Sequence, residues 1–267
     1  MHHFATTFRH AGDAGDIIYS LPVMRWLGGG ELYLEATDYT RVVMTPAIVD
    51  LFKPLLESQD YIHSVEFHTG QEVGVDLNAF RLRMRENHRR ETLAQMQLRS
   101  HGVPESELDK PWIKVSPRKT HRVIVNLTER YRNPQFPWRR VYEKYGAEMG
   151  FVGTEKEHAL FVQNVGTCPK VETVSLLDLA QVIAGSELFV GNQSLPLALA
   201  HAMHHPTVCE MSRTGIDGWH RTINCIGTAG ATIELPNLCR AKLPSAVTSR
   251  LHSALATALT WARAATQ

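Results

Sequence analysis

The chain has 267 residues, of which 43% are hydrophobic and 21% are charged, and its formal net charge is +1. This length allows one large domain or two domains of about 130 residues each, and the composition is that of a globular protein rather than a disordered one. The net charge near zero argues against a protein that coats nucleic acid or an anionic membrane through its overall electrostatic field. A local basic patch is still compatible with this net charge.

The cysteines and the apolar runs indicate an intracellular protein. The four cysteines are widely spaced and form no CxxC pair: Cys168, Cys209, Cys225 and Cys239. We therefore expect reduced thiols in or near the core. The given sequence shows no signal peptide, and none of its apolar runs approaches the roughly 18 residues of a membrane span, so we expect a cytoplasmic protein without such a span.

Strand and helix patterns alternate in the first part of the chain. A helix begins at Asp16, is bent by Pro22 and ends at the glycines at 28–30, and a second helix spans residues 46–56. The expected strands are residues 4–8, 31–36, 62–67 and 73–77. Such a run of strand–helix units predicts a mostly parallel, twisted sheet that binds ligands at the carboxyl ends of its strands.

A basic segment, residues 81–102, follows and becomes helical toward its end. A solvated helix face accounts for such a run of charge. The excess of arginine over lysine also suits contact with a phosphate or another acidic group.

The pattern restarts after residues 104–119, a polar, proline-containing segment that we interpret as the boundary between two halves. We expect a long loop over 128–146, a helix over 155–164 and a final amphipathic helix over 245–265. The expected strands are residues 121–127, 147–152 and 170–174.

Residues 175–211 contain the clearest pattern in the chain. A helix closed by Gly185 leads to a strand over 187–190, and a turn at Gly191 and Asn192 leads to a helix that Ser194 can cap and that ends before the strand at 207–211. Pro196 falls in the first turn of this second helix, where a missing N–H costs nothing. A strand that feeds a helix N-terminus through a tight turn is a common site for an anion.

Four segments, taken in order, resemble the lipopolysaccharide heptosyltransferases, glycosyltransferase family nine. GDIIYSLP at 15–22 is similar to that family's Gly-Asp-x-(apolar)-x-(small)-Leu-Pro opening, and FVGTEKE at 151–157 is similar to its apolar strand, turn and acidic helix start. The loop at 126–142, with Arg139 beside Pro137 and Trp138, resembles the family's donor loop. Residues 175–211 resemble its Ser-Leu-x-(Asp/Glu)-Leu-Ala helix and (Ser/Gly)-Asn-Asp-Ser-Gly-Pro turn.

This resemblance implies the GT-B fold, an α/β fold of two Rossmann-like domains with a cleft between them. Residues 1–115 would form the acceptor domain, 116–242 the nucleotide-sugar donor domain, and 243–267 a C-terminal helix that packs on or bridges them. The implied reaction moves a sugar from a nucleotide-sugar donor to an acceptor hydroxyl with inversion. It needs no metal and no cofactor, because the nucleotide sugar is a substrate.

The resemblance also indicates site residues. Asp16 matches the family's proposed base, and Asp13 is the reserve candidate, because a carboxylate on a glycine loop can accept the proton of a hydroxyl. The other acceptor-side candidates are Gly12, Gly15, Arg81 and Arg83. On the donor side, backbone N–H groups and arginines can meet the diphosphate. The candidates there are Thr128, Arg130, Arg132, Arg139, Gly153, Thr154, Asn192, Gln193 and Ser194.

The departures from the family leave alternatives open. Gln193 and Leu195 stand where the family has Asp and Gly, so the sugar is not assigned, and a catalytically degenerate nucleotide-sugar-binding protein is the main alternative. The acceptor can be a glycan, a small molecule or, given the basic segment, a modified nucleic-acid base. An epimerase is a weaker third choice. The chain is also short for the family, mostly in its N-terminal half.

Two further groups of residues have a structural and a functional interpretation. His201 and His205 have the i, i+4 spacing of metal ligands but no acidic or cysteine partner at motif spacing, so we expect no metal site. Asp217, Trp219 and His220 form a polar and aromatic loop, which either packs against the protein or supports a base or sugar.

Overall fold

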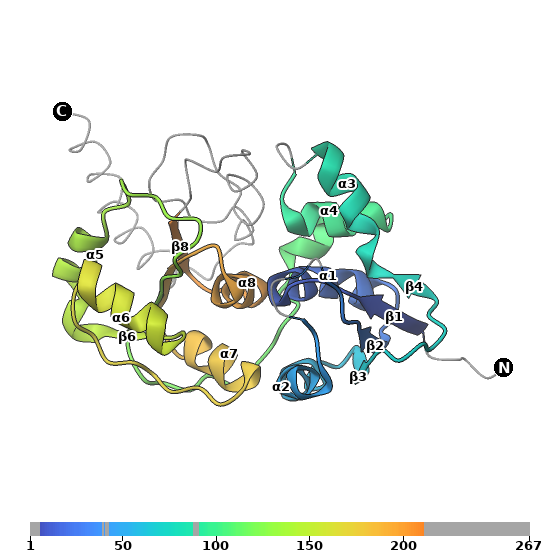
Figure 1. Cartoon of the computed structure of the whole chain (residues 1–267), viewed down its shortest axis with the longest axis horizontal. Coiled ribbons are helices and arrows are strands. Elements are labelled where there is room, and N and C mark those ends of the chain that lie inside the picture. The colour runs from blue at the N-terminus through green and yellow to red at the C-terminus, as the bar shows by residue number, and fades with distance from the viewer. Residues whose placement is uncertain (1–5, 39, 41–42, 88–90, 211–267) are drawn as a thin grey trace.

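The computed structural model describes residues 6–38, 40, 43–87 and 91–210, and these form two four-stranded parallel sheets (Figure 1). The first sheet has the order β3-β2-β1-β4, with β1 (Thr6–His10), β2 (Gly30–Leu34), β3 (Ile62–Phe67) and β4 (Val75–Asp76). The second has the order β6-β5-β7-β8, with β5 (Val123–Asn126), β6 (Met149–Phe151), β7 (Leu188–Asn192) and β8 (Thr207–Glu210). The predicted α/β fold class with parallel sheets is therefore confirmed.

Helices connect most of the strands. They are α1 (Ala14–Trp26), α2 (Pro46–Leu56), α3 (Phe80–Asn87), α4 (Leu93–Ser100), α5 (Trp138–Tyr145), α6 (Glu155–Asn164), α7 (Leu176–Ala184) and α8 (Leu195–Ala202). Three short 3-10 helices cover Leu77–Ala79, Glu105–Asp109 and Gly146–Glu148. The predicted bounds of α2, β3 and α6 are confirmed to the residue, and Pro22 lies inside α1.

The first sheet has one covered and one partly exposed face. The connections β1–α1–β2 and β2–α2–β3 run the same way across the sheet, so right-handed crossovers put both helices on one face. In Figure 1 both helices lie on the side that faces the other half of the molecule. The link from β3 to β4, residues 68–74, contains no helix. The outward residues of β1 and β2 are accordingly polar and partly exposed: Thr7, Arg9, Glu31 and Tyr33.

The second sheet is covered on both faces. Val123 and Val125 of β5 pack in one hydrophobic cluster with Trp138 of α5 and Phe161 of α6. Ile124, which points to the opposite face, packs in a second cluster with buried residues of α7 and α8. Strands that are buried on both faces are continuously apolar, as β5, β6 and β7 are apart from the asparagines that end β5 and β7.

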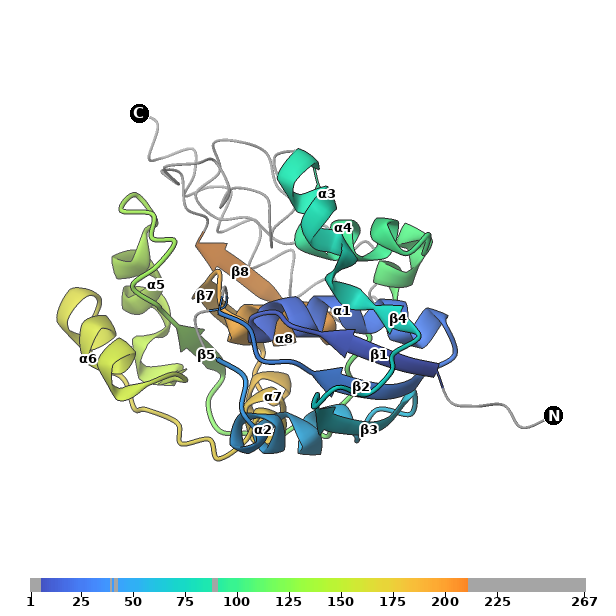
Figure 2. The same cartoon turned by 45° about the vertical axis from the view of Figure 1, so that its right-hand side comes forward.

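The two halves share a hydrophobic core. α1 packs against α8, and α2 packs against α7, as both views of the molecule show (Figures 1 and 2). The buried side chain of Trp112 lies between the halves, where its indole N–H donates to Ile18 O at 2.9 Å and its backbone N–H donates to Ala202 O at 2.9 Å. The segment 104–119 thus connects the sheets but is not a purely polar linker, and the domain limits drawn from it stay a prediction.

Some of the predicted elements differ from the structure. The predicted loop over 128–146 contains α5, because Trp138 and Val141 are buried on one side of a helical turn. Of the predicted strand at 170–174, only Lys170 forms a bridge, to Phe151. The predicted C-terminal helix lies outside the described residues. None of the helices in the described part of the chain has the length and apolar character that crossing a bilayer requires.

Candidate functional site

The two predicted strand–turn–helix units lie side by side. A Cβ atom added to Gly15 in α1 would lie 3.9 Å from Ala198 Cβ in α8, and Tyr19 Oη lies 2.7 Å from His201 Nδ1 further along both helices. The residue with the higher number in α1 contacts the residue with the higher number in α8, so the two helices run in the same direction. Since a helix rises 1.5 Å per residue, the N-termini are offset along the helix axes by no more than about one turn.

Three side chains from three elements hold the turn between β1 and α1. Asn78 Oδ1 accepts the N–H of Ala11 at 2.9 Å, and Arg81 Nη2 donates to Ala11 O at 3.1 Å. The N–H of Gly12 donates to His10 Nδ1 at 2.9 Å. Gly12 allows this close approach, because a Cβ atom there would lie 2.3 Å from His10 Cε1.

His10 was not predicted as a site residue, yet it forms the base of this turn. Its ring is fully buried and stacks on Phe80, with centroids 5.9 Å apart. Burial, with a smaller contribution from the Arg81 cation, lowers the pKa of His10 to about 3, so the ring is neutral and Nδ1 can accept the Gly12 N–H. A lone histidine at a strand end has no distinctive sequence signal.

The candidate acids lie at the start of α1. Asp16 Oδ2 is 3.8 Å from Arg81 Nη2, and both side chains are partly accessible, at 21% and 28%. Asp13 is the N-cap residue of α1, but its side chain does not cap the helix; its carbonyl oxygen accepts from Asp16 N at 2.8 Å. Five of the six acceptor-side and catalytic candidates therefore come together here: Gly12, Asp13, Gly15, Asp16 and Arg81.

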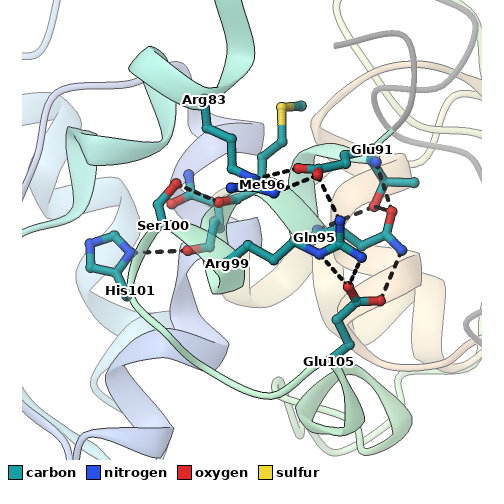
Figure 3. Close-up of polar contacts among 10 residues, drawn as sticks. Arg83, Glu91, Gln95, Met96, Arg99, Ser100, His101 and Glu105 are labelled. Carbon is teal, nitrogen blue, oxygen red and sulfur yellow. Dashed lines mark hydrogen bonds and ion pairs between the residues drawn. The ribbon is translucent and has the colours of Figure 1, made fainter. Parts of the chain in front are cut away.

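Arg83, the sixth candidate, lies in a separate ion-pair cluster (Figure 3). Its guanidinium makes two 2.6 Å hydrogen bonds to Glu91, whose side chain is only 6% exposed. Arg99 donates to the same carboxylate at 2.6 Å and also pairs with Glu105. In the described part of the basic segment, Arg83 and Arg99 thus have carboxylate partners, which supports the interpretation as a structural helix surface.

A buried amide network ties the carboxyl ends of β5, β6 and β7 together. Asn192 Oδ1 accepts from Thr128 N at 3.0 Å, and its Nδ2 donates to the carbonyls of Thr128 and Arg130 at 3.0 and 2.6 Å. Asn126 donates to Val152 O at 2.8 Å and accepts the Ser194 hydroxyl at 2.8 Å. Thr128, Asn192 and Ser194 are therefore brought together, as predicted, with Asn126 as an additional member.

The hydroxyl of Ser194 donates a hydrogen bond within this network and does not cap the helix. Ser194 is the N-cap residue of α8 but makes no side-chain cap, which corrects the prediction that it would. The first-turn N–H groups of a helix have no intrahelical acceptor, so those of α8, where Pro196 contributes none, can donate to a bound anion. Gln193, directly before Ser194, is 1% exposed.

The other donor-side candidates are more scattered. Arg132 Nε donates to Glu210, a buried carboxylate that also accepts from Asn133 N and from the indole of Trp138. Arg139 is 89% exposed and pairs with Glu143 on its own helix. The exposed Arg130 guanidinium lies 5.4 Å from the Tyr131 ring centroid.

Gly153 and Thr154 follow β6 at the same edge of the sheet. Gly153 has φ 145°, and a Cβ atom there would lie 3.0 Å from Asn126 Nδ2. Thr154 caps α6 in a reciprocal pair with Glu157. Both residues therefore have a local structural role beside the amide network.

The histidine pair is not arranged as a metal site. His201 Nδ1 lies against Tyr19, whereas His205 Nε2 lies 2.9 Å from Ser186 Oγ. Within residues 6–38, 40, 43–87 and 91–210, there is no group of three His, Cys, Asp or Glu side chains that could hold a metal ion. The loop with Asp217, Trp219 and His220 lies outside the described residues, and the described cysteines, Cys168 and Cys209, are buried.

Comparison with solved structures supports the fold. No protein-family model and no curated protein matches the sequence. The structure of the E. coli heptosyltransferase WaaC with ADP superposes with a TM-score of 0.51 at 12% identity, over 96% of this chain and 99% of that one. The family 9 glycosyl transferase from Veillonella parvula DSM 2008 gives 0.49 at 13% identity, over 76% of this chain and 79% of that one. The fold of this chain is therefore similar to that of WaaC, as the sequence motifs predicted.

Proposed function

We propose that this protein is a glycosyltransferase that moves a sugar from a nucleotide-sugar donor to an acceptor hydroxyl. The observation that carries the proposal is the parallel alignment of α1 and α8, because the acidic turn before α1 and the turn before α8, our candidate for the diphosphate site, then lie at the same end of the two helices. A base for the acceptor and a site for the leaving diphosphate are the two parts that sugar transfer needs. The similar fold of a heptosyltransferase supports this assignment.

In the proposed mechanism, the Asp16 carboxylate accepts the proton of the acceptor hydroxyl. The acceptor oxygen then attacks the anomeric carbon, and the bond between that carbon and the phosphate oxygen breaks with its electron pair leaving on the diphosphate. The first-turn N–H groups of α8 and the Arg130 cation stabilise the charge on the diphosphate. A single displacement inverts the anomeric centre and needs no metal ion.

Arg81 positions Asp16 in this proposal. It lies 3.8 Å from the Asp16 carboxylate and donates to Ala11 O, so it links the carboxylate to the backbone of the turn. The acceptor is a glycan or a small molecule. A nucleic-acid acceptor is less favoured, because Arg83 and Arg99 already pair with carboxylates; a steep salt dependence of DNA or RNA binding would reverse this preference.

The test measures release of nucleoside diphosphate from UDP-, GDP-, TDP- and ADP-sugars with candidate acceptors, with and without EDTA. We expect release that EDTA does not change, and a decrease in kcat of about 10²- to 10⁴-fold in Asp16→Asn, with unchanged diphosphate binding. Glu143→Gln, which removes a surface carboxylate on α5, is the control. Loss of release only in Asp13→Asn would move the base to Asp13, and binding without release by the wild type would support the degenerate binding protein.

A further inference from the structure

Glu210 is a charged residue that is fully buried at the carboxyl end of β8, and both of its side-chain oxygens accept hydrogen bonds. Oε1 accepts from Asn133 N and from Arg132 Nε, the latter at 3.1 Å. Oε2 accepts from the Trp138 indole N–H at 2.7 Å. A carboxylate is almost never buried without such partners. Because all three donors lie between the end of β5 and the first residue of α5, Glu210 fixes the end of this loop to β8.

The start of the same loop is fixed by Asn192, at the end of β7. Asn192 Oδ1 accepts from Thr128 N at 3.0 Å, and Nδ2 donates to Thr128 O at 3.0 Å and to Arg130 O at 2.6 Å. Between the two anchors, Tyr131 has φ 56°, in the left-handed region that a residue with a side chain rarely adopts. Such a conformation costs free energy and persists only where the surrounding contacts hold it. Asn192 on one side and Glu210 on the other supply contacts of this kind.

The anchored turn carries Arg130 at the carboxyl edge of the second sheet, where open α/β sheets bind their ligands. Arg130 is exposed, and its guanidinium lies 5.4 Å from the centroid of the Tyr131 ring, which attracts a cation. The left-handed turn thus places an aromatic ring beside this guanidinium. Arg132, in contrast, donates to the buried carboxylate of Glu210. Of these two arginines, Arg130 is therefore the better candidate to meet a diphosphate.

We propose that Glu210 is a positioning residue for sugar transfer, which holds the loop so that Arg130 is in place before the nucleotide sugar binds. This inference rests on the proposed function, because it takes Arg130 as a ligand of the diphosphate. A loop that is already ordered loses less conformational freedom on binding. Loosening the Glu210 anchor should therefore weaken diphosphate binding, although the buried carboxylate itself does not touch the ligand.

The test is a double-mutant cycle on the Kd of ADP, UDP and GDP, measured by calorimetry. We expect Arg130→Ala to weaken binding of the preferred diphosphate about 10- to 100-fold, because it removes a charged hydrogen-bond donor. Glu210→Gln keeps the side-chain volume but turns an NH₂ group toward N–H donors, and it should weaken binding about tenfold. In the Arg130→Ala background, Glu210→Gln should change Kd by no more than about twofold, because no cation is left to position.

Two further variants separate positioning from stability. Glu91→Gln also removes a buried carboxylate between arginines, but in the first half of the chain, so it should lower the melting temperature without changing Kd. Trp138→Phe removes one donor to Glu210 and keeps an aromatic ring, so it should give a smaller effect that also depends on Arg130, and it decides the question if Glu210→Gln does not fold.

The outcomes distinguish this inference from the proposed function. If the diphosphates bind but Glu210→Gln leaves Kd unchanged, or weakens binding equally with and without Arg130, this inference fails while the proposed function stands. If no diphosphate binds to the wild type, both fail.

Discussion

Gly12 shows how a single residue shapes the candidate site. A Cβ atom at this position would lie 2.3 Å from His10 Cε1 and 2.8 Å from Asp16 Cβ, so Gly12→Ala must displace the buried His10 ring. We expect a loss of about 1–3 kcal/mol in the free energy of unfolding, because forcing an extra methyl group into a packed site costs that much. Chemical denaturation of the two proteins measures it.

Gly15→Ala is the matched control for this prediction. Gly15 lies inside α1, and an added Cβ atom would meet only Ala198 Cβ at 3.9 Å, which is an ordinary contact. Because alanine favours a helix over glycine, we expect a gain of up to about 1 kcal/mol. Equal losses in both variants would contradict the role assigned to the His10 contact.

The sequence predicted these residues unevenly. Asn192 ends β7 and Asp16 lies in the first turn of α1, which follows β1, and the parallel-sheet pattern alone brings such positions to the carboxyl ends of the strands, so they could be found. His10 and Glu210 could not, because their burial depends on partners far away in the sequence, such as Phe80 for His10 and Trp138 for Glu210. The sequence therefore predicts where a site lies better than it predicts what supports the site.

At the scale of elements, the buried carboxylate of Glu91 holds α3 and α4 together. Arg83 from α3 and Arg99 from α4 both donate to Glu91, and the Arg83 hydrogen bond lowers the pKa of this carboxylate below its usual value (Figure 3). Glu91→Gln should lower the free energy of unfolding by about 1–3 kcal/mol at pH 7. This is less than the loss expected for a fully buried ion pair, because both arginine side chains are a third exposed or more. The loss is fully present above the pKa that Glu91 has in the unfolded chain, and it disappears as the pH falls through the lower pKa that Glu91 has in the folded protein.

Urea unfolding of the wild type and Glu91→Gln at pH 7 and pH 4 tests this. Glu105→Gln is the control, since Arg99 is the arginine that pairs with Glu105 and the Glu105 side chain is 39% exposed. This variant should lower the free energy of unfolding by less than Glu91→Gln does. Equal costs for the two variants at pH 7 would contradict a special role for Glu91.

Element prediction succeeded where the pattern is local and failed where distant contacts decide. Thr154 and Glu157 form a capping box that marks the start of α6 in the sequence. α5 was predicted as loop, because its helical side is identified only by Trp138 packing against Phe161 from α6. The partly exposed face of the first sheet follows from the alternation of polar residues such as Thr7 and Arg9 with buried ones along β1.

At the scale of the whole molecule, three buried histidines make stability depend on pH. Burial lowers the pKa of His10 and His201 to about 3 and that of His205 to about 4. In the unfolded chain each protonates near the ordinary value of 6.5. Between those values the unfolded state binds more protons than the folded state, so stability is fully present above about pH 6.5 and is lost as the pH falls.

We therefore expect the free energy of unfolding to decrease by about 4 kcal/mol per pH unit once all three histidines are protonated in the unfolded chain, at about 1.4 kcal/mol for each. Carboxylates such as Glu91, whose pKa is lowered, add to the loss only at lower pH. Urea unfolding at half-unit steps from pH 7.5 to pH 5 measures the slope.

His205→Gln, which can keep the hydrogen bond to Ser186 but cannot titrate, should reduce the slope by about a third. Because His201 lies in the contact between α1 and α8, with Nδ1 2.7 Å from Tyr19 Oη, a flat profile would mean that these histidines are not buried in solution.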